Sequence, residues 1–467
     1  MAAKADIRTN RTQRALLIAA LIGGALLLAL VAGLAAGNNR LLIASLFLLA
    51  PGGVFGALFV ARRFDLAVLL IPPLALLLPT LEAPTGTETK LPAVWVLAGG
   101  LLGFWFLTML LRGRWRFAPT ALNRPMLAFA IVCTISLIWG IVWRDPVLID
   151  APRFILVQIT SLLTVLFSIG AALLIGNFVQ SERRLKLIVV LFIVCGGLMA
   201  FTQYRDMHQT LLNDRGLWGT WAGVAAFGVL IAQPRLRWHW RAALLAVLGL
   251  ILYVSIIVNG DWVSGWVPLL AAMLTATLLR SWKLFLVVLV ITAIIGYTQL
   301  GFFTKVADDN INDGSLERLT LWEQNWRVVR AHWLFGTGPA GYALYYMTYY
   351  RDDARSTHNN YLDILAQFGF LGMAAWLWLT GTAAAIGWRL AHRAPPGFLR
   401  TLAIIATAGW VGANVSMFFG DWMLPFAYNQ GNGGFKYTVY SWIFLGTLIS
   451  LQQILRNDTA AAEVTHP

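Results

Sequence analysis

The chain has 467 residues, of which 59% are hydrophobic and 12% are charged, with a mean hydropathy of +0.70. Soluble domains carry about 25% charged residues, so this composition excludes a water-soluble fold. The net charge of +14 does not indicate nucleic acid, because the 35 Lys and Arg lie in short groups between apolar runs instead of on one face. Cys133 and Cys195 lie inside apolar runs and match no zinc or disulfide pattern.

Apolar runs of about 20 residues, long enough to cross a hydrocarbon core of about 30 Å, recur along the chain. The first run follows a basic stretch and is about twice as long as the apolar part of a signal peptide, so we interpret it as a membrane helix. Prolines and glycines interrupt the second and third runs. The sequence predicts about fourteen membrane spans, at 15–36, 41–61, 66–80, 92–111, 125–143, 154–179, 187–204, 217–232, 242–258, 263–279, 284–300, 360–388, 401–419 and 437–455.

The charges between the spans predict which loops face the cytoplasm. With the N-terminus inside, the inner loops hold 22 of the 35 Lys and Arg but only 5 of the 21 Asp and Glu. Basic inner loops are typical of membrane proteins, so we predict an all-α, polytopic transmembrane bundle with both termini cytoplasmic. Its predicted parts are helices one to eleven in residues 1–300, a large outer loop with short helices at 301–359, helices twelve to fourteen in 360–456 and a cytoplasmic tail at 457–467.

The loop 301–359 holds too many Trp and Tyr residues for a solvated linker, so we expect it to be ordered. Ser315 is a candidate N-cap of a helix, and Glu323 and Arg327 have the i, i+4 spacing of a helical ion pair. Glycines from Gly336 onward would end the helix in a tight turn. We predict that the helix lies on the outer leaflet through one apolar stripe, made of Leu319, Trp322, Trp326, Val329 and Trp333.

Four stretches on the predicted outer face carry residues suited to chemistry. They are Arg318 in the loop helix, the turn 335–339, the run 356–362 that continues to Gly372, and the loop 204–216 with Arg215. Arginine matches phosphate because its planar fork binds two oxygens, and a neutral His accepts a proton from a hydroxyl near pH 7. The start of a helix adds N–H donors. Together these groups suit a lipid-linked pyrophosphate leaving group and a sugar hydroxyl nucleophile.

Each stretch also has a structural interpretation. Arg318 would then form a surface ion pair, and His358 would help to cap the next helix. The turn 335–339 would be only a turn, since no GxxxxGK[ST] phosphate loop follows. The remaining arginines would anchor span ends at the membrane surface: Arg153, Arg205 and Arg215.

In their order along the chain, these residues resemble the bacterial O-antigen ligase and polymerase superfamily: Arg318 with Trp322, Phe335 to Pro339, His358 to Leu362 and Gly369 to Gly372. The resemblance implies a GT-C-like membrane glycosyltransferase of the bacterial inner membrane, with its active site on the periplasmic face. The donor would be a glycan on undecaprenyl pyrophosphate. The acceptor would be a lipid A–core sugar in a ligase, or another lipid-linked glycan in a polymerase. No nucleotide sugar, metal or other cofactor is implied.

The resemblance also implies roles for single residues. Arg215 and Arg318 would hold the pyrophosphate, and His358 would deprotonate or orient the acceptor hydroxyl. Many members carry Ser-Arg-Gly at the start of an earlier helix, where this chain has Val263-Ser264-Gly265-Trp266. Either another arginine replaces it, namely Arg153 or Arg205, or the donor is held differently. Further substrate contacts are expected from Asn359, Asn360, Tyr361, Gly336 and Gly338.

Three functions stay open at this point. A ligase and a polymerase share the same chemistry, and we favour the ligase because an ordered outer loop suits a large second amphiphile. A lipid or sugar transporter is the third, although no repeat relates two halves of the chain and the charges lie near span ends. A metal-dependent transferase is disfavoured, since the first outer loop, 37–40, holds no carboxylate. The expected partners are the donor lipid, the acceptor and membrane lipids, without nucleic acid.

Overall fold

The computed structural model describes residues 60, 62–84, 90–149, 151, 153–207, 209, 211–298, 301, 304, 316–350, 356–426 and 430–465. The predicted span 15–36 lies outside these residues, as does 41–61 apart from residue 60. The chain divides into two units, residues 1–67 and 68–467. In the first unit only residues 60 and 62–67 are described, so the architecture below is that of the second unit.

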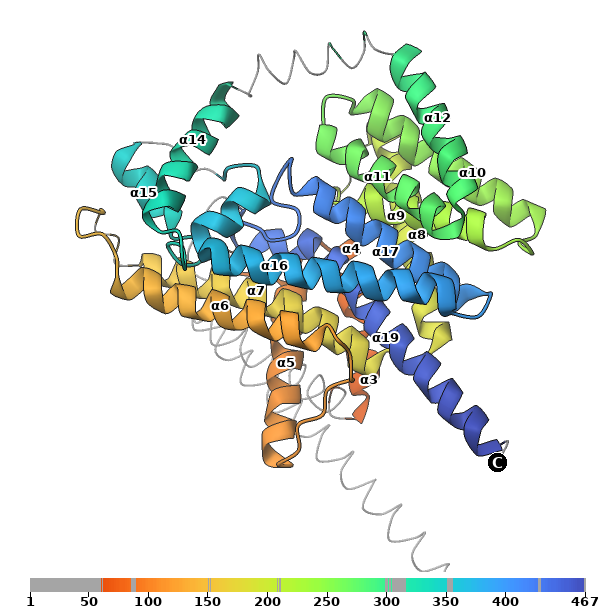
Figure 1. Ribbon diagram of the computed structural model, residues 1–467, viewed down its shortest axis with the longest axis horizontal. Coiled ribbons are helices and arrows are strands. Elements are labelled where there is room, and N and C mark those ends of the chain that lie inside the picture. Colours follow the sequence, from red (N-terminus) through yellow and green to blue (C-terminus); the bar gives the residue numbers. More distant parts are fainter. Residues whose placement is uncertain are drawn as a thin grey trace, which may run out of the picture. The chain divides into compact units, whose positions relative to one another are not determined.

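Helices make up nearly all of the second unit (Figure 1). Among the described residues, nine segments are long and apolar enough to cross a membrane, and each matches a predicted span. The shorter helices α9 (Trp218–Ala232) and α12 (Trp282–Thr298) match two more. The prediction of an all-α, polytopic bundle is therefore confirmed. The nine segments are α5 (Ala93–Leu111), α6 (Asn123–Val142), α7 (Phe154–Phe178), α8 (Glu182–Tyr204), α10 (Trp238–Tyr253) with the π-helix η1 (Val254–Val258), α11 (Val263–Arg280), α16 (Asn360–Arg393), α17 (Phe398–Ser416), and α19 (Phe435–Thr465) preceded by the 3-10 turn η3 (Gly431–Gly434).

The predicted span 66–80 is not one continuous helix. The structure has two short helices there, α3 (Phe64–Val68) and α4 (Ile71–Leu76), because Pro72 and Pro73 are tolerated only in the first turn of a new helix. Helix α4 is too short to cross a membrane, and its end pairs through a bridge between Leu77 and Leu212. A small antiparallel hairpin follows, formed by β1 (Glu82–Pro84) and β2 (Lys90–Pro92).

Small residues let the central helices pack closely. A Cβ on Gly409 of α17 would overlap the Trp221 ring of α9, and one on Gly412 would lie 2.5 Å from the Pro268 carbonyl oxygen of α11. The Trp221 ring stacks on Phe444 of α19 with a centroid distance of 4.2 Å. Helices in membranes associate through such close van der Waals contacts. Among the segments long enough to span a membrane, those of α17 and α19 are accordingly the most buried, whereas most residues of α5, α6 and α10 are not buried.

The described part of the predicted outer loop contains α14 (Leu316–Ala331) and α15 (Tyr342–Tyr349), which lie beside the start of α16 (Figure 1). The helix and its ion pair were predicted, and Glu323 and Arg327 pair at 2.7 Å. Ser315 lies outside the described residues. Of the predicted stripe, Val329 packs inward, on a face that also carries Leu321 and Val328.

Three members of the predicted stripe of α14 are instead exposed, at a spacing of seven residues: Leu319, Trp326 and Trp333. Apolar residues lie on two sides of this helix, and helical periodicity alone does not tell which side the protein covers. The exposed stripe is apolar, and the contact of α14 with the outer leaflet stays a prediction.

Helix α16 is broken at Gly369, and the turn 335–339 is inserted at the break. Gly369 has φ 66° and ψ −168° in an otherwise helical segment. The N–H groups of Thr337 and Gly338 donate to two carbonyls just before the break, at 2.9 and 3.0 Å. In return, the N–H of Phe370, just after the break, donates to a carbonyl just before the turn, at 2.8 Å. Two of the sequence motifs are therefore one structural unit that fixes the loop domain to the bundle.

We expect Gly369→Ala to lower the free energy of unfolding by about 1–3 kcal/mol. A Cβ at Gly369 would overlap the Leu334 carbonyl oxygen, and its positive φ is strained for any residue with a side chain. Thermal unfolding of the purified protein in detergent checks this. Gly381→Ala on the same helix is the matched control, because a Cβ there meets no described atom within 4 Å. Equal melting temperatures for the two variants would contradict the prediction.

Candidate functional site

The segment 356–359 leads into α16 and carries His358. Asn359 is the N-cap, since its side-chain oxygen accepts from the N–H groups of Tyr361 and Leu362 at 3.0 and 3.3 Å. The N–H of His358 donates to the Ser356 hydroxyl at 2.9 Å. His358 has φ 53°, a left-handed conformation uncommon for residues other than glycine. The residues on either side of His358 are buried whereas His358 itself is exposed, so this backbone conformation directs the imidazole toward the surface.

Two buried carboxyl groups lie beneath this segment. Asp363 of α16 accepts hydrogen bonds from the Tyr342 hydroxyl at 2.6 Å and the Thr357 hydroxyl at 2.7 Å. Asp421, between α17 and α19, interacts with the Asp363 carboxyl and the Ser356 hydroxyl. Burial, and then the charge of Asp363, raise the pKa of Asp421 well above its usual range. Burial and the same charge also raise the pKa of Tyr342, so its hydroxyl remains a donor.

Asn360 and Tyr361 join α16 to the segment after α17. Asn360 Oδ1 accepts from the N–H groups of Met423 and Leu424 at 3.0 and 3.1 Å, and its Nδ2 donates to the Leu424 carbonyl at 2.8 Å. The Tyr361 hydroxyl donates to the Asn414 carbonyl at 2.9 Å. Asn360 is fully buried. These polar groups, like the N-cap, serve the scaffold around the site, and their contact with substrate stays a prediction.

Helix α14 brings Arg318 to the same neighbourhood. Nε1 of Trp322 donates to the Thr357 carbonyl at 2.9 Å, directly beside His358. Arg318 precedes Trp322 by four residues and therefore lies on the same face of α14. Its side chain is partly exposed. The helix that carries Arg318 thus packs on the segment that carries His358.

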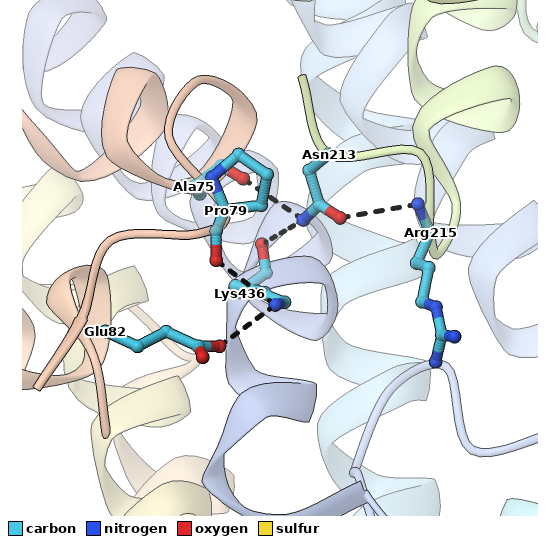
Figure 2. Close-up of polar contacts among 6 residues, drawn as sticks. All are labelled: Ala75, Pro79, Glu82, Asn213, Arg215 and Lys436. Carbon is cyan, nitrogen blue, oxygen red and sulfur yellow. Dashed lines mark hydrogen bonds and ion pairs between the residues drawn. The ribbon is translucent and has the colours of Figure 1, made fainter. Parts of the chain in front are cut away.

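Arg215 is held by a polar clamp around the buried Asn213 (Figure 2). Oδ1 of Asn213 accepts from the N–H of Arg215 at 3.3 Å, and its Nδ2 donates to the carbonyls of Ala75 and Lys436, both at 3.2 Å. Lys436 pairs with Glu82 of β1 at 3.2 Å. The exposed side chain of Arg215 extends away from this clamp. Helices α4 and α19 therefore fix the backbone of the loop, while the guanidinium reaches outward.

Tyr437 of α19 lies between the loop of Arg215 and the segment that carries Asp421. A Cβ on Gly216 would lie 2.5 Å from the Cβ of Tyr437. The Tyr437 ring lies 5.9 Å from the Trp422 ring, and Trp422 directly follows the buried carboxyl between α17 and α19. Through Tyr437 and Trp422, the surroundings of Arg215 are therefore connected to the segment that carries Asp421, which lies near His358.

The stretch that lacks the arginine of the family borders the same segment. The Trp262 ring, just before α11, lies 5.6 Å from the Trp422 ring. A hydrogen bond of 3.2 Å joins Asn259 to Gln203 at the end of α8, and the exposed Arg205 follows two residues later. Arg153 is exposed at the start of α7. The end of α8, which carries Arg205, is thus bonded to the turn that leads into this stretch.

Gly336 and Gly338 lie buried inside the molecule. The N–H of Gly336 donates to the His332 carbonyl at 2.9 Å, and that of Gly338 to the Gln367 carbonyl at 3.0 Å. A Cβ on Gly338 would lie 3.0 Å from the Ser136 carbonyl oxygen of α6. Backbone donors that are already bonded are not available to a phosphate. This arrangement favours a structural role for the two glycines, and their predicted contact with substrate stays untested.

Several residues around His358 and Arg215 were not singled out from the sequence: Tyr342, Asp363, Asp421 and Asn213. The available signal for the two aspartates was an acidic residue within or beside an apolar run, where a charge is unusual. The amide and the tyrosine carried no comparable signal, because Asn and Tyr are common near membrane surfaces.

A family model described as O-antigen ligase matches residues 211–377. The match begins just before Arg215 and contains Arg318, the turn 335–339, His358 and the break of α16 at Gly369. A comparison with curated proteins gave no match. The match is confined to residues 211–377, and this part of the chain is similar to the O-antigen ligase family, as the sequence motifs predicted.

Proposed function

We propose that this chain is an O-antigen ligase of the bacterial inner membrane. It transfers a glycan from undecaprenyl pyrophosphate to a hydroxyl of lipid A–core, or of another surface acceptor, on the periplasmic face. The observation that carries the proposal is the exposed side chain of His358: the residue before it, Thr357, bonds to the buried Asp363 and to Trp322 of α14, the helix that carries Arg318.

The chemistry follows from these groups. His358 accepts the proton of the acceptor hydroxyl while that oxygen forms a bond to the anomeric carbon of the donor glycan. The bond between this carbon and the pyrophosphate oxygen breaks, and the leaving group keeps the electron pair. Arg215 and Arg318 neutralise the charge that develops on the pyrophosphate. A single displacement of this kind inverts the anomeric centre.

Two further arginines are proposed donor contacts. The stretch 263–266 has no arginine. Arg205 follows the end of α8, which is bonded to Asn259 in the turn before this stretch, so we assign Arg205 to the part of the donor that the family arginine would hold. Arg153 is the alternative at the start of α7. Asn359, Asn360 and Tyr361 support His358 through the hydrogen bonds described above.

A reconstituted assay separates the ligase from the polymerase. Purified protein in lipid is supplied with undecaprenyl-pyrophosphate glycan, with and without a lipid A–core acceptor, and products are resolved by gel mobility. We expect product only when the acceptor is present. A ladder of glycans formed from the donor alone would overturn the ligase in favour of a polymerase of the same superfamily.

We expect transfer to continue in excess EDTA, because the proposed countercharges for the pyrophosphate are guanidinium groups. Among the described residues, no three His, Cys, Asp or Glu side chains are placed together as metal ligands. The measurement is the initial rate of transfer with and without chelator. Full loss of activity, restored by magnesium or manganese, would contradict this expectation.

A further inference from the structure

Asp363 and Asp421 form a carboxyl pair directly beneath the segment that carries His358. The pair is buried, with exposed fractions of 1% and 2%, respectively. Its members come from the first turn of α16 and from the segment between α17 and α19. Within the described part of the chain, no Lys or Arg forms an ion pair with either carboxyl group. A buried pair without a cation is expensive, so its retention in the fold requires compensating hydrogen bonds.

Each member of the carboxyl pair holds one of the two residues before His358. The Thr357 hydroxyl donates to Asp363 Oδ1 at 2.7 Å, and the Ser356 hydroxyl interacts with Asp421. The Ser356 oxygen also accepts the N–H of His358 at 2.9 Å. The side chains of Ser356 and Thr357, which bond to the carboxyl pair, therefore stabilise the left-handed conformation of His358.

The two carboxyl groups differ in their surroundings. Asp363 is surrounded by donors, with Tyr342 and Thr357 on Oδ1 and the Asn360 amide on Oδ2 at 3.4 Å. Asp421 accepts from the Gln430 amide on Oδ2 at 3.2 Å, and its Oδ1 has no hydrogen-bond donor among the described residues. Asp363 thus holds Thr357 together with Tyr342 and Asn360, and Asp421 holds Ser356 together with Gln430.

We propose that Asp363 and Asp421 are positioning residues for His358. Asp363 fixes the segment through the Thr357 hydroxyl, and Asp421 fixes it through the Ser356 hydroxyl. This inference rests on the proposed function of His358 as the base that deprotonates the acceptor.

Apolar and amide substitutions test the two positions, because an amide keeps an acceptor oxygen for a hydroxyl group and leucine does not. Asp363→Leu removes the acceptor of the Thr357 hydroxyl, and we expect kcat to fall about 10- to 100-fold with the donor KM unchanged. Asp421→Asn keeps an acceptor for the Ser356 hydroxyl, so it should retain a kcat at least about tenfold above that of Asp421→Leu, which has none.

Thr357→Val tests the positioning of His358 while both carboxyl groups remain in place. It removes one hydroxyl of the His358 segment, and we expect kcat to fall about tenfold or more with the donor KM unchanged. Thr447→Val is the matched control, since this buried threonine of α19 bonds only within its own helix, to the Phe444 carbonyl at 2.7 Å. Melting temperatures in detergent show that each variant is folded.

Equal kcat values for Thr357→Val and Thr447→Val, or for Asp421→Asn and Asp421→Leu, would overturn the inference. If transfer depends on His358 but not on these substitutions, the positioning role fails and the proposed function stands. If transfer is indifferent to His358→Ala as well, both fail.

Discussion

His358→Ala is expected to abolish glycan transfer, with kcat lower by about 10²- to 10⁴-fold, the usual contribution of a positioned general base. Donor affinity should stay within about threefold of the wild type, because the proposed pyrophosphate contacts are arginines on other elements. The segment itself should remain in place, since its bond to Ser356 is made by the backbone N–H and its neighbour Asn359 caps α16. The variant therefore removes a reacting group and leaves the scaffold.

The measurement is the rate of acceptor-dependent transfer in lipid, together with donor binding to the same preparation. His392→Ala is the matched control, because His392 is exposed near the far end of α16 and its Nδ1 contacts only the Trp388 carbonyl of its own helix, at 2.8 Å. Wild-type rates in His358→Ala would contradict the assignment of the base. Glycan movement across the membrane that persists without transfer would favour the transporter.

The helical spans were predictable from the sequence because each depends on local composition. A run of about 20 apolar residues forms a helix in a membrane whatever lies beside it, since its backbone must bond internally. The exception is instructive: at 66–80, apolar composition predicted a span, but Pro72 and Pro73 divide the region into α3 and α4. Length and hydropathy are therefore sufficient only where no backbone restriction intervenes.

Contacts between segments far apart in the sequence were harder to predict from the sequence. The motifs at 335–339 and 369–372 were recognised separately, but their hydrogen bonds across the break of α16 depend on a fold that brings them together. Asp363 and Asp421 are separated by 57 intervening residues, and nothing local indicates that the two carboxyl groups meet. The side of α14 that packs against the protein was also not predicted, since both sides of the helix are apolar. Tertiary contacts, and not helical propensity, decide these features.

The two arginines are proposed to differ in how they are held. Arg215 follows a loop whose backbone is fixed by the buried Asn213, so its guanidinium starts from a defined point (Figure 2). Arg318 lies near the start of α14, where the helix dipole adds positive potential and Trp322 ties the helix to the His358 segment. A pyrophosphate has two charged groups, and two guanidinium forks on separate elements match that separation of charge.

Replacing either arginine is therefore expected to weaken binding of the donor pyrophosphate. For Arg215→Ala and Arg318→Ala we expect kcat/KM for the donor to fall about 10- to 100-fold each, since a hydrogen bond to a charged group contributes about 1.5–3 kcal/mol. Lysine at either position should recover only part of the loss, because an ammonium group does not bind two oxygens at once.

Steady-state kinetics with varied donor, and competition by undecaprenyl pyrophosphate, measure both effects. Arg327→Ala is the matched control, an exposed arginine on α14 that pairs with Glu323 at 2.7 Å. A donor affinity that responds equally to Arg327→Ala and Arg318→Ala would point to general surface charge instead of a pyrophosphate site.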